Sequence, residues 1–537
     1  MDYSTGKLAF IFIIAVTLSW AGAWVLAHRY RSAMRRLMSA PAVAATSAVA
    51  GGSGVGIEGA ADVAANLPPL PVTANDNRRA DLRLAALLVA LSCLMALSSA
   101  ALFLVFGIDD PFSFKRLAVL ALARTWPVVP VLGLMWRWSR VRLLAMLVLW
   151  CLLCFAVMLW RSIEPRPLEL LLFLAGEVGV PMLLVTLLCL GDATRAIASW
   201  LLPPLVGLVW ASIVGVDLLA LMVERRSPWL LSLPSWLGAE VVIVLFTLAP
   251  WLVAWWPLKW LGRALARAYV RKWLSELMVL FTAVWAITLL CQALSSASSL
   301  GLGGLVMLLP LAWIPLVMML SQRRVPLRGR PATLLVLRVF QHDAQVQELF
   351  DHVIERWRLT GNTVLIAGTD LADRTLDADD IFTFLDGGLA QRFIRTPADV
   401  APRLAAFDLG ADAEGRYRIN EVYCHDTTWQ DALAALVRHS DVVLMDLRGF
   451  RAHNGGCCHE LATLARAQRL ARVVVLTDGK TDRAAATAAA AGAPAERFVW
   501  LDASNIGGRE RREVLRSLFV LPSGAEPRGM AEQQSAA

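Results

Sequence analysis

The sequence predicts a protein of two parts: an α-helical membrane bundle with about nine spans, followed by an α/β domain with a doubly wound, mostly parallel sheet. Long apolar runs are concentrated before residue 322, and short strand-like runs alternate with helical ones after it. The chain is 57% hydrophobic and 18% charged, with a mean hydropathy of +0.58, whereas soluble proteins are about 25% charged. This composition excludes a wholly soluble or disordered chain, and eight cysteines in 537 residues exclude a disulfide scaffold.

Residues 1–38 are predicted to form an amino-terminal membrane anchor, with its apolar run at residues 8–27. A signal peptide would carry its positive charge before the run, but here Lys7 alone precedes it and four arginines follow between residues 29 and 36. An uncleaved anchor with an external amino terminus therefore fits better. Residues 39–82 are rich in Ala, Gly and Pro and are predicted to be a flexible cytoplasmic linker.

Eight further spans are predicted in a second membrane segment, residues 83–322, because a helix needs about 20 apolar residues to cross the hydrocarbon core. They are residues 84–106, 117–136, 143–160, 168–190, 197–223, 237–256, 277–294 and 302–320. The strongly basic loops all fall on one side of this arrangement, which predicts a cytoplasmic carboxy-terminal half in a bacterial inner membrane. Residues 259–273 have arginines about four apart and are predicted to be a helix lying on the inner surface.

Three ionisable side chains fall well inside the spans, namely Arg124, Glu177 and Asp217. Arg124 and Glu177 lie at similar predicted depth, and a buried charge is expensive without a partner, so we expect a mutual ion pair. An internal structural pair and a proton or ion relay both remain open.

Residues 328–520 are predicted to form the α/β domain, and residues 521–537 a disordered tail. Strand-like runs occur at 334–340, 363–368, 441–446, 472–477 and 498–501, and helical patterns at 343–357, 429–437, 460–468 and 509–518. Ligands of such sheets bind beyond the carboxyl ends of the strands. The candidate ligand-binding residues at these ends are His342, Asp343, Arg448 and Asp478. The sequence contains neither a Walker A nor a GxGxxG phosphate loop.

The segment from Ser440 to Asp446, followed by Cys457-Cys458-His459-Glu460-Leu461, resembles Toll/interleukin-1 receptor (TIR) domains, in which a strand and loop precede a Cys-x-x-Glu-Leu helix start. Residues 339–343 are loosely similar to the first motif of that family. In members that hydrolyse NAD the helix glutamate is catalytic, which implies this role for Glu460. Nucleoside deoxyribosyltransferase-like folds are similar as well, and there Asp446 and Glu460 match an acidic strand end and a helix glutamate. A simple capping role for Glu460 at the helix start is the alternative.

A second cluster has residue types that suit zinc, but the paired Cys-x₂-Cys spacing is absent and no metal is expected; it comprises Cys424, His425, Asp426, His453, Cys457, Cys458 and His459. The sequence thus predicts an integral membrane sensor or signalling protein whose cytoplasmic domain binds a nucleotide-like ligand, with NAD as a candidate. A transporter or a membrane scaffold with a regulatory domain is the alternative, and enzymatic activity is left open. The expected partners are the lipid bilayer and a second copy through the cytoplasmic domain. The net charge of +8 is attributed to cytoplasmic loops, so no nucleic acid is expected.

Overall fold

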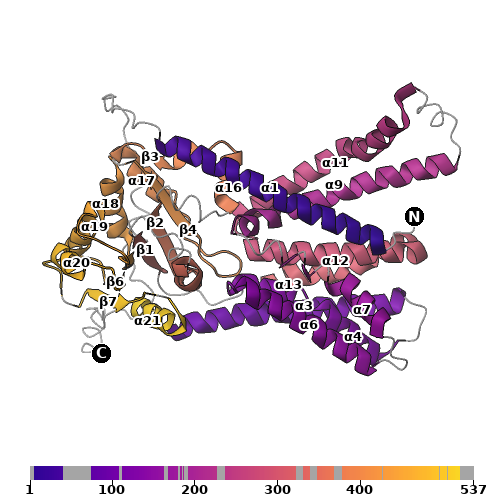
Figure 1. The fold of residues 1–537 in the computed structure, drawn as a ribbon, viewed down its shortest axis with the longest axis horizontal. Helices are drawn as coiled ribbons and strands as arrows, with labels where there is room; N and C mark the ends of the chain where they lie inside the picture. Colours follow the sequence, from indigo (N-terminus) through magenta and orange to yellow (C-terminus); the bar gives the residue numbers. More distant parts are fainter. Residues whose placement is uncertain are drawn as a thin grey trace, which may run out of the picture. The chain divides into compact units, whose positions relative to one another are not determined.

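The computed structural model divides into two compact units, shown in Figure 1. The membrane unit comprises Met1–Ala33, Leu84–Arg324 and Thr375–Asp386, and the α/β unit comprises Met34–Arg83, Val325–Arg374 and Gly387–Ala537. Within them the structure describes residues 5–39, 74–107, 112–161, 167–179, 182–183, 185–186, 192–225, 236–321, 330–338, 348–367, 378–425, 427–494, 496–504 and 506–519. The predicted tail at 521–537 and most of the predicted linker lie outside these residues.

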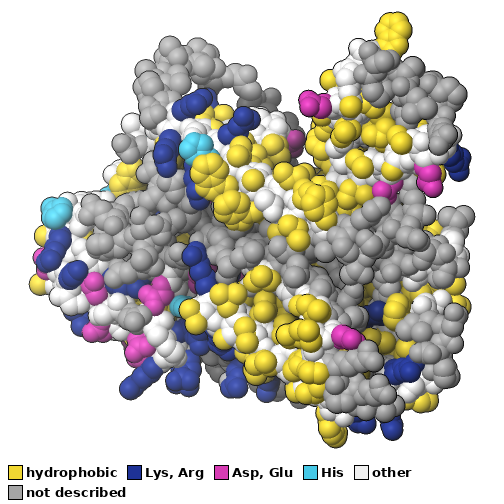
Figure 2. All heavy atoms as spheres, turned by 45° about the vertical axis from the view of Figure 1, so that its right-hand side comes forward, with side chains coloured by type: hydrophobic (Ala, Val, Ile, Leu, Met, Phe, Trp, Pro, Cys, Tyr) yellow, Lys and Arg dark blue, Asp and Glu magenta, His cyan; other side chains and the backbone are white. Residues whose placement is uncertain are grey.

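The described part of the membrane unit is helical throughout. Its elements, some of which extend into the other unit, are α1 (Thr5–Ser39), α3 (Ala74–Phe106), α4 (Phe114–Arg124), α5 (Val128–Met135), α6 (Arg140–Arg161), α7 (Pro167–Leu174), the π-helix η1 (Ala175–Gly179), α9 (Asp192–Glu224), α11 (Ala239–Val270), α12 (Glu276–Leu300), the 3₁₀-helix η2 (Gly301–Ala312) and α13 (Trp313–Ser321). Five described stretches are long and apolar enough to cross a membrane: Asp76–Phe106, Phe114–Met135, Arg140–Arg161, Ile197–Glu224 and Ala239–Val270. Hydrophobic side chains form continuous areas on the outside of the molecule, as Figure 2 shows, which a bilayer would cover.

Two predictions for this half are wrong in detail. Residues 259–270 do not form a separate surface helix, because α11 continues through Pro257 to Val270. Residues 74–82 of the predicted linker are helical and form the start of α3. The predicted span at 117–136 corresponds to Phe114–Met135, which contains a turn at residues 125–127, where Pro127 lacks the N–H that a regular helix would use.

Helices α9 and α11 approach each other closely at two glycines. A methyl group on Gly215 would meet the carbonyl oxygen of Phe246, and would lie 2.7 Å from Cγ of Pro250. A methyl group on Gly207 would lie 2.6 Å from Leu258. Small residues that let backbones approach are the usual basis of helix association in lipid.

One helix from the carboxy-terminal half packs within the membrane unit. Helix α16 (Ala378–Leu385) places Phe382 against Trp200 and Tyr269, with ring centroids 5.2 Å and 5.6 Å apart. The Ala378 N–H donates to Oε1 of Glu276 at 3.3 Å. The sequence predicted no helix here, and the whole of residues 328–520 was expected in the α/β domain.

The α/β unit contains a seven-stranded sheet in which every pairing is parallel, in the order β3-β4-β2-β1-β5-β6-β7. The strands are β1 (Ala332–Arg338), β2 (Gly361–Ala367), β3 (Phe393–Ile394), β4 (Ile419–Cys424), β5 (Val442–Asp446), β6 (Arg472–Thr477) and β7 (Phe498–Asp502). The helices are η3 (Phe350–Ile354), α15 (Glu355–Trp357), η4 (Leu389–Arg392), η5 (Pro397–Asp399), α17 (Val400–Ala405), α18 (Trp429–His439), α19 (Gly455–Arg466), α20 (Arg483–Ala489) and α21 (Gly508–Phe519). The predicted parallel α/β sheet is confirmed. Strands β3 and β4 were not predicted.

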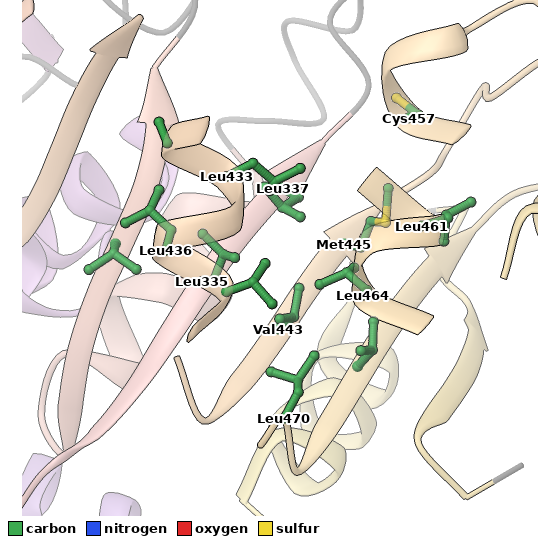
Figure 3. Packing of buried hydrophobic residues seen from close by; sticks show 14 of the residues in the cluster. Leu335, Leu337, Leu433, Leu436, Val443, Met445, Cys457, Leu461, Leu464 and Leu470 are labelled. Atoms are coloured by element: carbon green, nitrogen blue, oxygen red, sulfur yellow. The ribbon is translucent and has the colours of Figure 1, made fainter. Parts of the chain in front are cut away.

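Helices cover both faces of this sheet, so its strands are apolar on both sides. On one face Leu335, Val443 and Met445 pack against Leu433 of α18 and Leu461 of α19 (Figure 3). On the other face lie η3, α15 and α21, where the rings of Trp357 and Phe519 stack at 5.0 Å. The chain is therefore doubly wound about β1, as the alternating pattern predicted.

Candidate functional site

The strand order places a topological switch point between β1 and β5. From β1 the chain proceeds to β2 on one side, and after β4 it returns to β5 on the other side of β1. In sheets of this type ligands bind outside the carboxyl ends of the strands at that point. The last residues of these two strands, Arg338 and Asp446, are direct register partners. Both side chains are buried, although charged residues normally avoid burial.

Asp446 is held by Arg448, two residues further along the chain. The Arg448 Nε donates to Oδ1 of Asp446 at 2.8 Å, and Nη2 donates to Oδ2 at 2.6 Å. The backbone N–H of Arg448 also donates to Oδ1, at 3.1 Å. The Arg448 side chain has no exposed surface. Both oxygens of Asp446 are therefore occupied, which is the geometry that makes a buried ion pair tolerable.

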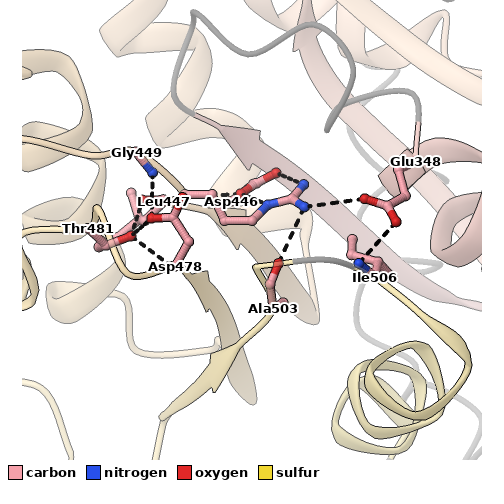
Figure 4. Close-up of polar contacts among 9 residues, drawn as sticks. Glu348, Asp446, Leu447, Gly449, Asp478, Thr481, Ala503 and Ile506 are labelled. Carbon is pink, nitrogen blue, oxygen red and sulfur yellow. Dashed lines mark hydrogen bonds and ion pairs between the residues drawn. The ribbon is translucent and has the colours of Figure 1, made fainter.

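The same guanidinium connects three loops at the carboxyl edge of the sheet (Figure 4). Its Nη1 lies 3.5 Å from the carbonyl oxygen of Ala503, which follows β7, and 3.8 Å from Oε2 of Glu348, which precedes η3. The other oxygen of Glu348 accepts the Ile506 N–H at 3.0 Å. Arg448 organises this edge of the sheet, and its predicted role in ligand binding stays a prediction.

Asp478 also stabilises a loop. Its Oδ1 accepts the Gly449 N–H at 2.9 Å and the Thr481 hydroxyl at 2.8 Å, which joins the loops that follow β5 and β6 (Figure 4). Burial alone would raise the pKa of this carboxyl, but these hydrogen bonds outweigh burial and hold the pKa below its usual value. The Oδ1 atom of Asp478 is thus already in use as an acceptor within the fold.

Glu460 is the exception among the acidic groups at this edge. It is 6% exposed and lies in the second turn of α19, since that helix begins at Gly455 rather than at the predicted residue 460. Burial raises the pKa of this carboxyl to about 8, and the nearby Arg338 opposes that shift. Its Oε2 is buried without a hydrogen-bond partner among the described residues.

The capping alternative for Glu460 does not hold, because Asn454 occupies the cap position directly before Gly455, and Glu460 lies six residues after Asn454. A helix amino terminus favours an ionised carboxyl. For Glu460 burial outweighs that effect and raises the pKa. A buried titratable group with a strongly shifted pKa is typical of functional sites.

The amino-terminal turn of α19 lies at the same edge, because α19 follows β5 in a parallel sheet. Its first two residues, Gly455 and Gly456, have open space where a side chain would project. The backbone N–H groups of such a turn attract anions such as phosphate. The turn leads directly to the buried Glu460, so exposed glycine backbone and a carboxyl with a raised pKa occupy the same helix.

Three further candidate residues, His342, Asp343 and Asp426, lie outside the described residues, and their predicted roles stay predictions. Burial raises the pKa of the Cys424 and Cys457 thiols to about 12, which makes both thiols unreactive. In the parts of the chain that the structure describes, no three His, Cys, Asp or Glu residues come together as metal ligands.

In the membrane unit Arg124 lies at the carboxyl end of α4, where its Nη1 donates to Oγ of Ser99 at 3.0 Å. The Ser99 hydroxyl donates to Oε1 of Gln292 at 2.8 Å, so α3, α4 and α12 share a polar cluster. The side chain of Glu177 lies outside the described residues, and its predicted pairing with Arg124 stays a prediction. Asp217 is a half-buried residue of α9.

Comparisons of the chain with protein-family models, with curated proteins and with solved structures found no match. The site therefore rests on geometry alone. Two of its residues, Arg338 and Glu348, were not predicted. Arg338 carries the one charge within the apolar run of residues 334–340, and a lone charge in a buried strand could have marked it as a candidate site residue.

Replacing Asp446 with Asn should destabilise the α/β unit by about 3–5 kcal/mol, because it leaves Arg448 buried beside a neutral amide. The measurement is the loss of hydrogen-exchange protection in β5 and β6. Asp431→Asn, on the exposed face of α18, is the matched control and should change protection by less than about 0.5 kcal/mol. Equal protection in the two variants would contradict a structural role for this pair.

The stability of the α/β unit should fall as pH rises from about 4.5 to about 8, the ordinary and folded pKa values of Glu460. In this window the unfolded chain holds fewer protons than the folded one, so the slope is negative and reaches about 1.4 kcal/mol per pH unit. Glu460→Gln removes the titration. The variant should therefore lose this part of the slope, measured as rate-corrected hydrogen exchange of residues 455–466 across the window. An unchanged slope in the variant would contradict the shifted pKa.

Proposed function

We propose that the protein is a membrane-anchored sensor or signalling protein whose α/β unit binds a nucleotide-like ligand at the β1–β5 switch point. The observation that carries the proposal is Glu460, a buried carboxyl with an unsatisfied oxygen, beside Arg338 at the carboxyl edge of a doubly wound sheet. An unsatisfied buried polar atom is costly unless a ligand or water satisfies it. The glycine-led turn of α19 supplies donors for a phosphate on the same helix.

Helix α16 supports sensing as the purpose of the binding. The segment between β2 and β3 begins beyond the carboxyl end of β2, at the edge where the ligand is proposed. Its residues Thr375–Asp386 pack as part of the membrane unit, with Phe382 between Trp200 and Tyr269. A ligand that altered the sheet would therefore act, through the covalent chain, on a helix that belongs to the membrane unit.

A second candidate function is hydrolysis of an N-glycosidic bond, with NAD as the substrate class; the resemblance of residues 440–461 to TIR domains and deoxyribosyltransferase-like folds supports it. The positive charge of the nicotinamide ribosyl group would lower the pKa of Glu460 and ionise it. The carboxylate would then stabilise the oxocarbenium-like transition state. The C–N bond breaks with its electron pair going to nicotinamide, and water adds to the ribose carbon while losing a proton to Glu460.

One preparation of the full chain in lipid nanodiscs distinguishes these functions. We expect NAD or a related nucleotide to raise the thermal midpoint and to alter hydrogen exchange in α16, and Glu460→Gln to weaken binding at least tenfold. Release of free base by the wild type, abolished in Glu460→Gln, would establish the hydrolase instead. The exposed Glu496→Gln is the matched control and should behave as the wild type.

Absence of binding by every nucleotide in the panel would contradict both functions and favour the transporter or scaffold alternative. Exchange in α16 that does not respond to a bound nucleotide would contradict the sensor but leave the binding site intact. The other expected interaction is self-association through the α/β unit. We test it by measuring the mass of the protein-containing nanodiscs with and without nucleotide.

For the membrane part we propose nine spans in the cell membrane, an external amino terminus and a cytoplasmic α/β unit. The distribution of basic loops supports this arrangement. Reporter fusions after residue 60 and at the carboxy terminus should both be active as cytoplasmic reporters. A periplasmic signal from either fusion would contradict the arrangement.

A further inference from the structure

The α/β unit carries a concentration of arginines on two helices that the candidate site does not use. The first is the amino-terminal end of α3, and the second is α21. We refer to their arginines, together with Arg356, as the basic surface: Arg78, Arg79, Arg83, Arg356, Arg509, Arg511, Arg512 and Arg516. All of these residues belong to the α/β unit. Six of them are exposed, and only Arg356 and Arg511 are half-buried.

Contacts around Arg356 bring the two helices together. Its Nη1 donates to Oδ2 of Asp81 at 2.6 Å, and Asp81 is a buried residue of α3. Asn77, one turn earlier, donates to Oγ1 of Thr360 at 3.3 Å. On α21, Arg511 is close enough to Arg356 and Asp81 for both charges to affect its pKa. The Trp357 ring, next to Arg356, stacks on Phe519 of α21 at 5.0 Å. The start of α3 and α21 are therefore neighbours at Arg356 and Arg511, and the exposed Arg509, Arg512 and Arg516 lie on other sides of α21.

Positive charge on this surface exceeds the negative charge that could balance it. The two helices carry seven of these arginines against four carboxylates, Asp76, Asp81, Glu510 and Glu513. Asp81 already forms an ion pair with Arg356, and Oδ1 of Asp76 lies 3.9 Å from Nη1 of Arg79. Burial lowers the pKa of Arg511, and repulsion from Arg356 and Arg512 lowers it further. An anion bound at this surface would relieve that repulsion.

The position of the surface along α3 determines which anion is within reach. Helix α3 continues without a break from Arg83 into the apolar stretch that ends at Phe106. Because an α-helix rises 1.5 Å per residue, Arg78 lies only about 9 Å along the axis from Leu84, where that stretch begins. An α3 that spans the bilayer would therefore hold these arginines at the level of the lipid headgroups, where basic residues attract anionic lipid.

We propose that the basic surface binds the phosphate groups of anionic phospholipids and so holds the face formed by α21 and the start of α3 against the membrane. Arginine suits this ligand because its planar guanidinium donates two parallel hydrogen bonds to a phosphate. The α/β unit would then experience changes in the anionic lipid content of its own leaflet, independently of any nucleotide at the switch point.

The test is the lipid retained by the full chain after purification from mixed phosphatidylcholine and phosphatidylglycerol nanodiscs, measured by mass spectrometry. We expect the wild type to enrich phosphatidylglycerol, and Arg509→Gln/Arg512→Gln/Arg516→Gln to lose that enrichment, by up to about a hundredfold in affinity. The matched control neutralises three exposed arginines elsewhere in the α/β unit, Arg438, Arg466 and Arg469, and should retain the enrichment.

Three results would overturn the proposal: equal enrichment in the triple variant, an equal loss in the control, or displacement of the lipid by inorganic phosphate, which would indicate a free-phosphate site. Replacing the same α21 arginines with Lys keeps the charge and should preserve most of the enrichment. Unaltered hydrogen exchange in β1 and β5 of the triple variant establishes that it folds.

Discussion

The buried ion pair between Asp446 and Arg448 is the interaction on which the carboxyl edge of the sheet depends. It forms within two residues of chain, so little chain entropy opposes it, yet its guanidinium reaches Ala503 and Glu348 in loops more than 50 residues away in either direction. Because every charge in this group has a partner of opposite sign, the edge tolerates burial that would otherwise cost several kcal/mol. The loops after β5 and β7 therefore have one stable arrangement, with the segment before η3 attached to it.

Glu460 differs from Asp446 in how its carboxyl oxygens are satisfied. Two carboxyls lie near one edge: Asp446 has both oxygens occupied by a buried arginine, while Glu460 has an oxygen with no partner in the described chain and a pKa raised to about 8. The oxygens of Asp446 are engaged within the fold, whereas Glu460 retains an acceptor oxygen that a ligand or water would satisfy.

The sequence was sufficient for the parts of the fold that depend on periodic burial. The runs that became β1, β2, β5, β6 and β7 are almost wholly apolar because helices cover both faces of the sheet. Strand β4 was not predicted because the polar residues Asn420 and Glu421 interrupt its apolar pattern. In the folded chain Asn420 accepts the Asp408 N–H, and Glu421 accepts the Tyr423 hydroxyl. The sequence alone does not reveal these two contacts. The same limit applied at the site, where the sequence placed Arg448 and Asp478 at the strand ends but did not predict their hydrogen bonds to Asp446, Gly449 and Thr481.

Segments that leave one unit and pack in the other are the second feature that local sequence did not predict. Helix α3 begins among residues of the α/β unit, where Asp81 meets Arg356, and continues as an apolar helix of the membrane unit. Helix α16 has the opposite course, since the strands before and after it belong to the α/β sheet while Phe382 packs on Trp200 and Tyr269. A helix transmits displacement along its axis because its backbone hydrogen bonds resist bending. Helix α3 therefore joins the two units through one continuous helix, whereas α16 lies in the membrane unit and is connected to the sheet only by the chain on either side of it.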